Sequence, residues 1–245
     1  MPAYSLADPP VLAFIVIPIA LVALMAWGVA HAWLRAGRPA AAARRSASVT
    51  VVCAAAWMAI TAAAGQNGVL RDWAANPPPF ALLVVGILVI GVSIAFGPVG
   101  SRLARYVPLW VLVAVQAFRL PLELAMHAMY ERGIMPEQMS YAGRNFDIVT
   151  GITALPVAAL LAAGRGGRTL ATAWNVLGLA LLLNVVTIAI LSTPRFAYFG
   201  GERLNVWVTY VPFVWLPAVM VLAALAGHLI VFRALAAPKI KKAGA

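Results

Sequence analysis

Long apolar stretches recur along the whole chain, and each is close to the 20 or so residues that a helix needs to cross a bilayer. Such windows run over residues 11–34, 47–65, 79–98, 107–130, 146–164, 169–192 and 207–235. With 64% hydrophobic and only 10% charged residues, the composition excludes a soluble domain. We therefore predict an all-α, polytopic membrane bundle of seven transmembrane helices in one domain, residues 1–235, followed by a basic tail, 236–245. The window at 47–65 is short and rich in Ala, so six spans are the alternative count.

The charges between the windows predict an orientation. In one set of alternate connections and in the C-terminal tail, every charged residue is basic. These residues are Arg35, Arg38, Arg44, Arg45, Arg102, Arg105, Arg165, Arg168, Arg233, Lys239, Lys241 and Lys242. The opposite connections hold Arg71, Arg132, Arg144, Arg195 and Arg203 against Asp8, Asp72, Glu131, Glu137, Asp147 and Glu202. By the positive-inside rule the N-terminus lies outside and the C-terminus in the cytoplasm.

The orientation also accounts for the formal net charge of +11. The basic loops lack the aromatic residues of a base-stacking surface, so no nucleic-acid partner is predicted. The lipid bilayer is the expected partner, and the sequence indicates no protein partner.

A polar stripe interrupts the fourth window. Gln116, Arg119, Glu123, His127 and Tyr130 are spaced three or four residues apart. On a helix that advances about 100° per residue, they fall within an arc of roughly 80°. Charge within a membrane is costly, so this stripe must face a partner or a cavity.

Other windows place polar residues near the same predicted outer depth. These are Asn145, Asp147 and Thr150 around the start of the fifth helix, Asn184 and Thr187 in the sixth, and Tyr210 in the seventh. Together with the stripe they predict a polar, ligand-binding pocket in the outer half of helices four to seven. The connection from Glu131 to Asn145 would form either a lid over this pocket or a plain exposed loop.

A structural role is the alternative to a binding role. Arg119 and Glu123, at i and i+4, can form a buried ion pair that fixes helix positions, with Asn184 and Thr187 as interhelical hydrogen bonds. Such a lock does not require His127, Tyr130, Asn145 and Asp147 at the same depth. The number of polar groups therefore favours a functional site.

Several cofactor chemistries fit the sequence poorly, and no cofactor is predicted. Every lysine lies at 239, 241 or 242, so a membrane helix offers none for a retinal Schiff base. Glu123, His127 and Asp147 could hold a metal, but Arg119 competes for the carboxylate. His31 and His228 lie at similar inner depth and could ligate haem if the first and last helices are neighbours. Two hydrogen-bonded interfacial histidines are the alternative.

The second half of the sequence carries motifs of a known kind. These are Phe118-Arg119-Leu120-Pro121-Leu122-Glu123 with His127, Pro136, Met139, the run Gly143-Arg144-Asn145-Phe146-Asp147-Ile148, and Pro212-Phe213-Val214-Trp215-Leu216-Pro217 with His228. In these motifs the chain resembles a family of uncharacterised bacterial seven-helix integral membrane proteins. The resemblance implies a multi-pass protein of the bacterial inner membrane and carries over no activity.

We expect the outer pocket to bind or transport a small polar or anionic solute, with Arg119 as the positive anchor. Glu123 and His127 would couple occupancy to protonation, since a histidine beside a carboxylate titrates near neutral pH. One alternative is an intramembrane enzyme that acts on a lipid or quinone-like substrate, with His127 or Glu123 as general base. The other is an accessory subunit whose buried polar groups only fix packing. The sequence favours a binding protein over an enzyme.

Overall fold

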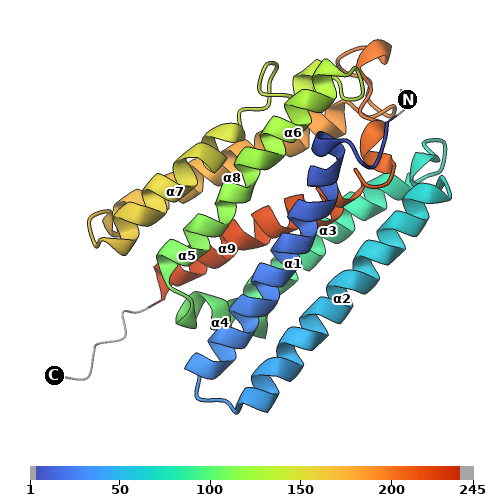
Figure 1. Ribbon diagram of the computed structural model, residues 1–245. Helices are drawn as coiled ribbons and strands as arrows, with labels where there is room; N and C mark the ends of the chain where they lie inside the picture. The colour runs from blue at the N-terminus through green and yellow to red at the C-terminus, as the bar shows by residue number, and fades with distance from the viewer. Residues whose placement is uncertain (1–3, 238–245) are drawn as a thin grey trace.

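The computed structural model describes residues 4–237, and every regular element in this range is helical. The α-helices are α1 Pro9–Arg35, α2 Ala40–Gln66, α3 Pro79–Phe96, α4 Pro98–Tyr106, α5 Leu109–Ala114, α6 Arg119–Glu131, α7 Ile148–Ala162, α8 Gly167–Leu191 and α9 Leu222–Ala236 (Figure 1). Short 3-10 turns are η1 Val69–Arg71, η2 Val115–Phe118, η3 Glu137–Met139, η4 Gly201–Arg203 and η5 Trp207–Thr209. A π-helical stretch, η6 Leu216–Val221, leads directly into α9.

Six helical segments are long and apolar enough to cross a membrane. They are Pro9–Arg35, Ala40–Gln66, Pro79–Phe96, Leu109–Glu131, Gly167–Leu191 and Leu216–Ala236. The prediction of a helical membrane protein is confirmed at this level. The apolar helix α7 has 15 residues, about 22 Å at 1.5 Å per residue, and is shorter than the hydrocarbon core of about 30 Å.

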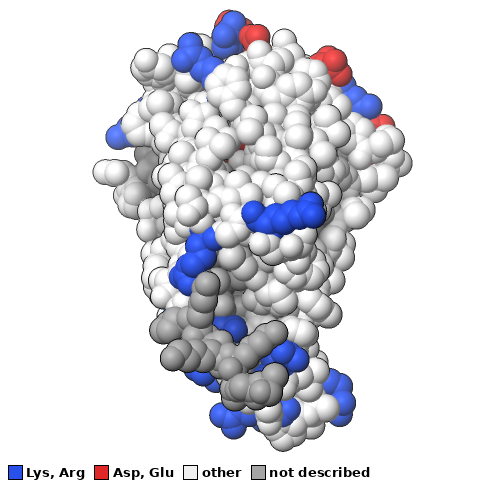
Figure 2. Space-filling model, turned by 90° about the vertical axis from the view of Figure 1, so that its left-hand side faces the viewer, with Lys and Arg blue, Asp and Glu red and all other residues white. Residues whose placement is uncertain are grey.

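Charged side chains are unevenly placed on the surface. Figure 2 shows that the surface acidic side chains gather at one end of the visible face, while Lys and Arg are found at both ends. The three lysines of the predicted tail lie outside the described residues.

Prolines account for the main differences from the expected helices. The last span begins at Leu216 rather than at 207, after the turn η5 and an irregular stretch that contains Pro212. A proline lacks the N–H that a helix interior needs, and it disfavours helical backbone in the residue before it. Pro39 precedes the first residue of α2, so α2 begins at Ala40 and includes Arg44 and Arg45 of the expected connection. An additional helix, α4, occupies the next basic connection.

A proline also reshapes the fourth span, which was expected to be one α-helix. Pro121 would clash with the carbonyl of Ala117, four residues earlier, in a regular α-helix. The chain instead narrows to the 3-10 turn η2 between α5 and α6. Gln116, on η2, and Arg119, at the start of α6, therefore lie where the helix changes its pitch.

The helices form a bundle in which α3 and α9 pack together, α1 contacts α2, α4 and α6, and α7 contacts α6 and α8 (Figure 1). The helix α2 lies at one edge and is largely exposed. Its C-terminal half is tied to the bundle by two indole hydrogen bonds, from Trp57 Nε1 to the Ala218 carbonyl at 2.8 Å and from Trp215 Nε1 to the Met58 carbonyl at 3.1 Å.

The connection between α6 and α7 folds into the bundle. Met135 and Met139 join the main hydrophobic core, and Ser140 and Asn145 are fully buried. The expected plain exposed loop is thus not what this segment forms. Its rim remains at the surface, where Glu137 pairs loosely with Arg203, 3.9 Å away.

A glycine allows α7 to lie against the start of α6. A Cβ atom at Gly151 would collide with the backbone of Arg119 and Leu120. The two backbones therefore approach more closely than any other residue type permits.

We predict that Gly151→Ala lowers the free energy of unfolding by about 1–3 kcal/mol, the usual cost of overpacking a close contact. Thermal unfolding of the purified protein in detergent measures this change. Gly86→Ala on α3 is the matched control, because a Cβ there meets nothing within 4 Å. Equal stability of both variants would contradict the close contact.

Candidate functional site

A buried ion pair joins the start of α6 to the residue that precedes α7. Arg119 is 1% exposed and Asp147 is 4% exposed. The Nη1 atom of Arg119 donates to Asp147 Oδ1 at 2.6 Å and to the Gly178 carbonyl on α8 at 3.2 Å. The hydroxyl of Thr150, one turn into α7, also donates to Asp147 Oδ1, at 3.1 Å. Three helices are thus connected through one guanidinium group.

Asn145 connects the second carboxylate to this pair. Its Nδ2 donates to Glu123 Oε2 at 2.8 Å and to the Met139 carbonyl at 2.9 Å. Its Oδ1 accepts from the backbone N–H of Asp147 at 3.0 Å. The expected pair of Arg119 with Glu123 is therefore corrected: Arg119 pairs with Asp147, and Glu123 is held by Asn145.

A second polar pair lies between α8 and α9. His228 Nδ1 lies 2.7 Å from Asn175 Oδ1, and Asn175 Nδ2 donates to the His228 carbonyl at 3.0 Å. An amide oxygen only accepts, so Nδ1 carries the proton and Nε2 is a bare acceptor in the neutral ring. A Cβ atom at Gly178 would meet this imidazole and Thr150, so glycine leaves the space in which they meet.

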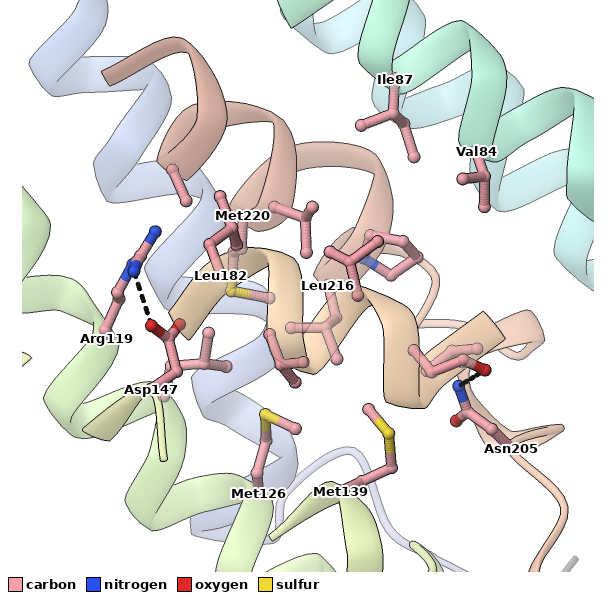
Figure 3. Close-up of a pocket in the computed structure, with 18 of the residues that line it drawn as sticks. Val84, Ile87, Arg119, Met126, Met139, Asp147, Leu182, Asn205, Leu216 and Met220 are labelled. Carbon is pink, nitrogen blue, oxygen red and sulfur yellow. Dashed lines mark hydrogen bonds and ion pairs between the residues drawn. The ribbon is translucent and has the colours of Figure 1, made fainter. Parts of the chain in front are cut away.

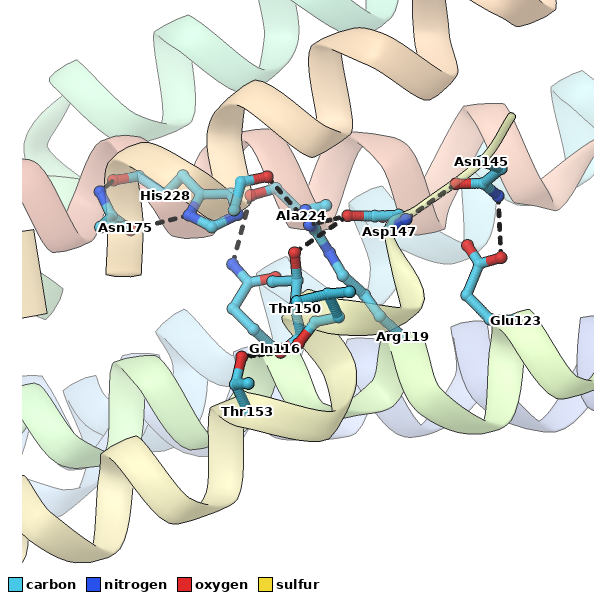
Figure 4. Close-up of polar contacts among 12 residues, drawn as sticks. Gln116, Arg119, Glu123, Asn145, Asp147, Thr150, Thr153, Asn175, Ala224 and His228 are labelled. Atoms are coloured by element: carbon cyan, nitrogen blue, oxygen red, sulfur yellow. Dashed lines mark hydrogen bonds and ion pairs between the residues drawn. The ribbon is translucent and has the colours of Figure 1, made fainter. Parts of the chain in front are cut away.

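These groups lie in a row across the bundle, which Figure 4 shows from Asn175 and His228 at one end to Asn145 and Glu123 at the other. Gln116 adjoins its centre, where its Nε2 donates to the Ala224 carbonyl at 3.3 Å. We call this set the polar network: Gln116, Arg119, Glu123, Asn145, Asp147, Thr150, Asn175 and His228.

Several buried atoms of the polar network have no hydrogen-bond partner among the described residues. They are Arg119 Nε and Nη2, Gln116 Oε1 and His228 Nε2. Buried polar atoms are nearly always satisfied by protein, water or ligand. A free buried donor or acceptor on a residue that lines a cavity therefore indicates a place for a polar ligand.

A cavity of about 80 Å³ adjoins the network at Arg119, Glu123 and Asp147, between α3, α6, α8 and η6. Arg119 and Asp147 lie at one end and Asn205 at the other, with Met126, Met139 and Met220 between them (Figure 3). Glu123 is the remaining charged residue of its wall. The volume suffices for several waters or a small solute, since one water needs roughly 10–15 Å³ on this measure.

The structure brings together only part of the predicted site. Gln116, Arg119, Glu123, Asn145, Asp147 and Thr150 belong to the polar network. His127 instead lies 2.8 Å from Ser140 Oγ and 3.6 Å from Glu131, and its ring stacks on Tyr141. The expected titratable pair of Glu123 with His127 is therefore not formed.

The other predicted residues lie around the edges. Tyr130 packs beside His127, and Asn184 donates to the Arg144 carbonyl at 2.9 Å. Thr187 is exposed and bonds only within its own helix, to the Leu183 carbonyl. The guanidinium of Arg71 lies over the ring of Tyr210, and its Cζ atom is 4.1 Å from the ring centre.

Two buried asparagines and one histidine have roles that the pocket prediction missed. Asn175 holds His228, and Asn205, which bonds the Ala189 carbonyl, lies in the cavity wall. Each is an isolated polar residue in or beside an apolar window, a signal that itself indicates a buried contact. His31 and His228, considered above as haem ligands, have separate partners: His31 stacks on Trp27, and His228 bonds Asn175. Within residues 4–237, no group of three His, Cys, Asp or Glu is placed to hold a metal ion.

We predict that Asp147→Asn destabilises the protein by about 3–5 kcal/mol, because it leaves the buried Arg119 charge without a counter-ion. Glu123→Gln should cost less than about 1 kcal/mol, since its amide oxygen still accepts from Asn145. Thermal or denaturant unfolding in the same detergent compares the two variants, each of which removes one carboxylate. A larger loss for Glu123→Gln would show that Arg119 pairs with Glu123 instead.

Comparison with known proteins identifies the family of this chain. No match was found among curated proteins or among solved structures. Residues 78–236 match a family described as a domain of unknown function (DUF8737). This range covers α3 to α9, more than half of the chain, and includes the whole polar network. The chain therefore belongs to the DUF8737 family.

Proposed function

We propose that this membrane protein binds a small carboxylate-bearing solute in the cavity beside Arg119 and moves it together with a proton. The observation that carries this proposal is that Arg119, which lines the cavity, keeps two buried guanidinium atoms, Nε and Nη2, without a partner among the described residues.

The geometry of these two atoms selects the ligand class. Nε–H and one N–H of Nη2 lie parallel on one side of the planar guanidinium, and this fork matches the two oxygens of a carboxylate. Asp147 and Gly178 occupy only Nη1, so they hold the guanidinium in place without using the fork. The apolar remainder of the cavity wall would accommodate a short hydrocarbon part.

The local charges supply a reason for proton coupling. Asp147 balances Arg119, and an ionised Glu123 then leaves the cluster with one net negative charge. A bound carboxylate would add a second negative charge in a region of low dielectric, where uncompensated charge is costly. Uptake of one proton at the Glu123 end would offset that cost, so anion and proton would bind together.

We also propose that the chain crosses the membrane seven times, with its N-terminus outside. The helix α7 is too short to cross alone, but the buried segment from Met135 to Asn145 adds protein depth at its outer end. Irregular backbone is tolerated at membrane depth where protein surrounds it. On this arrangement the solute would reach the cavity from the outer face.

A packing role is the second candidate, and the contact of Arg119 with α7 and α8 favours it. An ion pair that only fixes the helices would need no ligand at Nε and Nη2. The two candidates differ in the effect of a substitution that keeps the charge but removes the fork.

We predict that one or more of formate, acetate, lactate and benzoate stabilise the wild-type protein, and that Arg119→Lys abolishes this effect. A lysine can still pair with Asp147 but offers no planar fork. A ligand at about ten times its Kd adds about 1.4 kcal/mol, which raises the melting temperature by about 3–6 °C in a chain of this size. Thermal unfolding in detergent with each sodium salt, against sodium chloride, measures the shift.

Two controls complete this experiment. Arg203→Lys, at an exposed position, should keep the full shift, and Glu123→Gln should bind the anion with less dependence on pH. If none of the four anions shifts the wild type, or if Arg119→Lys responds as the wild type does, the carboxylate proposal fails and the packing role remains.

Single cysteines test the proposed topology. They are introduced into the Cys53→Ala variant, which lacks the one native cysteine. An impermeant maleimide added to intact cells should label Asn67→Cys, whereas Arg38→Cys and Arg165→Cys should react only after permeabilisation. All three positions are exposed. Labelling of Arg165→Cys from outside would mean that α7 does not cross.

A further inference from the structure

A second and much larger cavity lies on the other side of η6. It has a volume of about 600 Å³ and is enclosed by α1, α2, α3, α4, α5, η2, η6 and α9. Its wall is almost entirely apolar and includes Leu21, Met25, Trp57, Leu103, Leu222 and Ile230. The volume falls within the roughly 300–1,000 Å³ of pockets that enclose whole organic ligands.

Most polar groups of this wall are already satisfied within the protein. The Thr50 hydroxyl donates to the Ser46 carbonyl at 3.0 Å, and Trp57 Nε1 donates to the Ala218 carbonyl. Gln116 is different because it is 1% exposed and only one end of its amide is bonded. Its Nε2 donates to the Ala224 carbonyl, whereas its Oε1 has no partner among the described residues. The residues that line the cavity therefore combine apolar side chains with one amide whose oxygen has no hydrogen-bond partner.

The attachment of α2 gives this cavity a side that faces the bilayer. Hydrogen bonds from the bundle to α2 involve Trp57, Met58 and Gly65, and all of these lie in its outer half. The cavity-lining residues of α2 run from Val49 to Trp57, so this stretch ends at the first residue with such a bond. Cys53 and Val49 of this stretch are exposed. In a membrane, lipid hydrocarbon would surround this part of α2.

We propose that this cavity is a binding site for a membrane-soluble molecule that carries a hydroxyl group on a long hydrocarbon chain. The hydroxyl group would donate a hydrogen bond to Gln116 Oε1. The bilayer would supply such a molecule past the inner half of α2. This site is separate from the cavity beside Arg119, and the inference does not rest on the carboxylate proposal.

The chemistry of the wall favours a hydroxyl over other polar groups. An amide oxygen only accepts, so the ligand must offer a donor. A charged ammonium or phosphate has no counter-ion among the described lining residues, and an unpaired charge in an apolar site is strongly disfavoured. A neutral hydroxyl satisfies Oε1 and leaves the rest of the molecule to contact the apolar wall.

The test is photolabelling of the full-length protein in phospholipid nanodiscs with two matched probes. One is hexadecan-1-ol with a diazirine in mid-chain, and the other is its methyl ether, which has the same chain but no donor hydrogen. Mass spectrometry then locates the labelled peptides. We expect the alcohol to label peptides that contain residues 49–57 or 218–230 at several times the yield of the ether.

Variants separate a specific site from general contact with lipid. Gln116→Leu should lower labelling by the alcohol to that of the ether, and Ala54→Phe, which fills the cavity, should lower labelling by both probes. Thr50→Val and Ala63→Phe are the controls and should behave as the wild type, since Thr50 bonds within α2 and Ala63 lies outside the cavity.

Equal labelling by the two probes in the wild type would overturn the proposal and indicate only lipid-like filling of the space. A preference for the alcohol that persists in Gln116→Leu would also overturn it. Should Gln116→Leu fail to fold, Ala54→Phe against Ala63→Phe still decides whether the labelled site is this cavity.

Discussion

The ion pair between Arg119 and Asp147 sets the geometry around which the C-terminal half is built. A guanidinium within a membrane requires a counter-charge, and the chain supplies it from the residue just before α7 rather than from the same helix. That choice brings the start of α7 deep into the bundle. The segment before α7 must then fold inward, and glycines at 151 and 178 must replace larger residues so that the three helices meet.

The sequence predicted the class of fold and the burial of Arg119 and Glu123, because hydropathy and helical spacing are properties of one segment at a time. It did not predict the partners. Helical spacing makes Glu123 a neighbour of Arg119, whereas Asp147 reaches Arg119 only through the tertiary packing of α7. His127 lies on the same helical stripe, yet the inward fold of the loop gives it Ser140 instead of Glu123. The ends of the last span also depended on prolines that hydropathy ignores.

The π-helical stretch η6 has a structural role between two unlike spaces. Leu216, Pro217 and Met220 line the small cavity beside Arg119, while Ala218 and Val219 line the large apolar one. A π-helix widens the turn, and such stretches are frequent at functional sites. Here it lets one short segment present side chains to both spaces, while Gln116 and Arg119 line one space each.

The two cavities draw on different parts of the chain. Every member of the polar network lies within residues 78–236, the range shared with the family, but α1 and α2 contribute much of the wall of the apolar cavity and lie before that range. Replacement of this N-terminal hairpin would change the wall of the apolar cavity while every residue of the polar network stayed the same. The proposed lipid site thus depends on a two-helix hairpin outside the family region, whereas the site at Arg119 lies wholly within it.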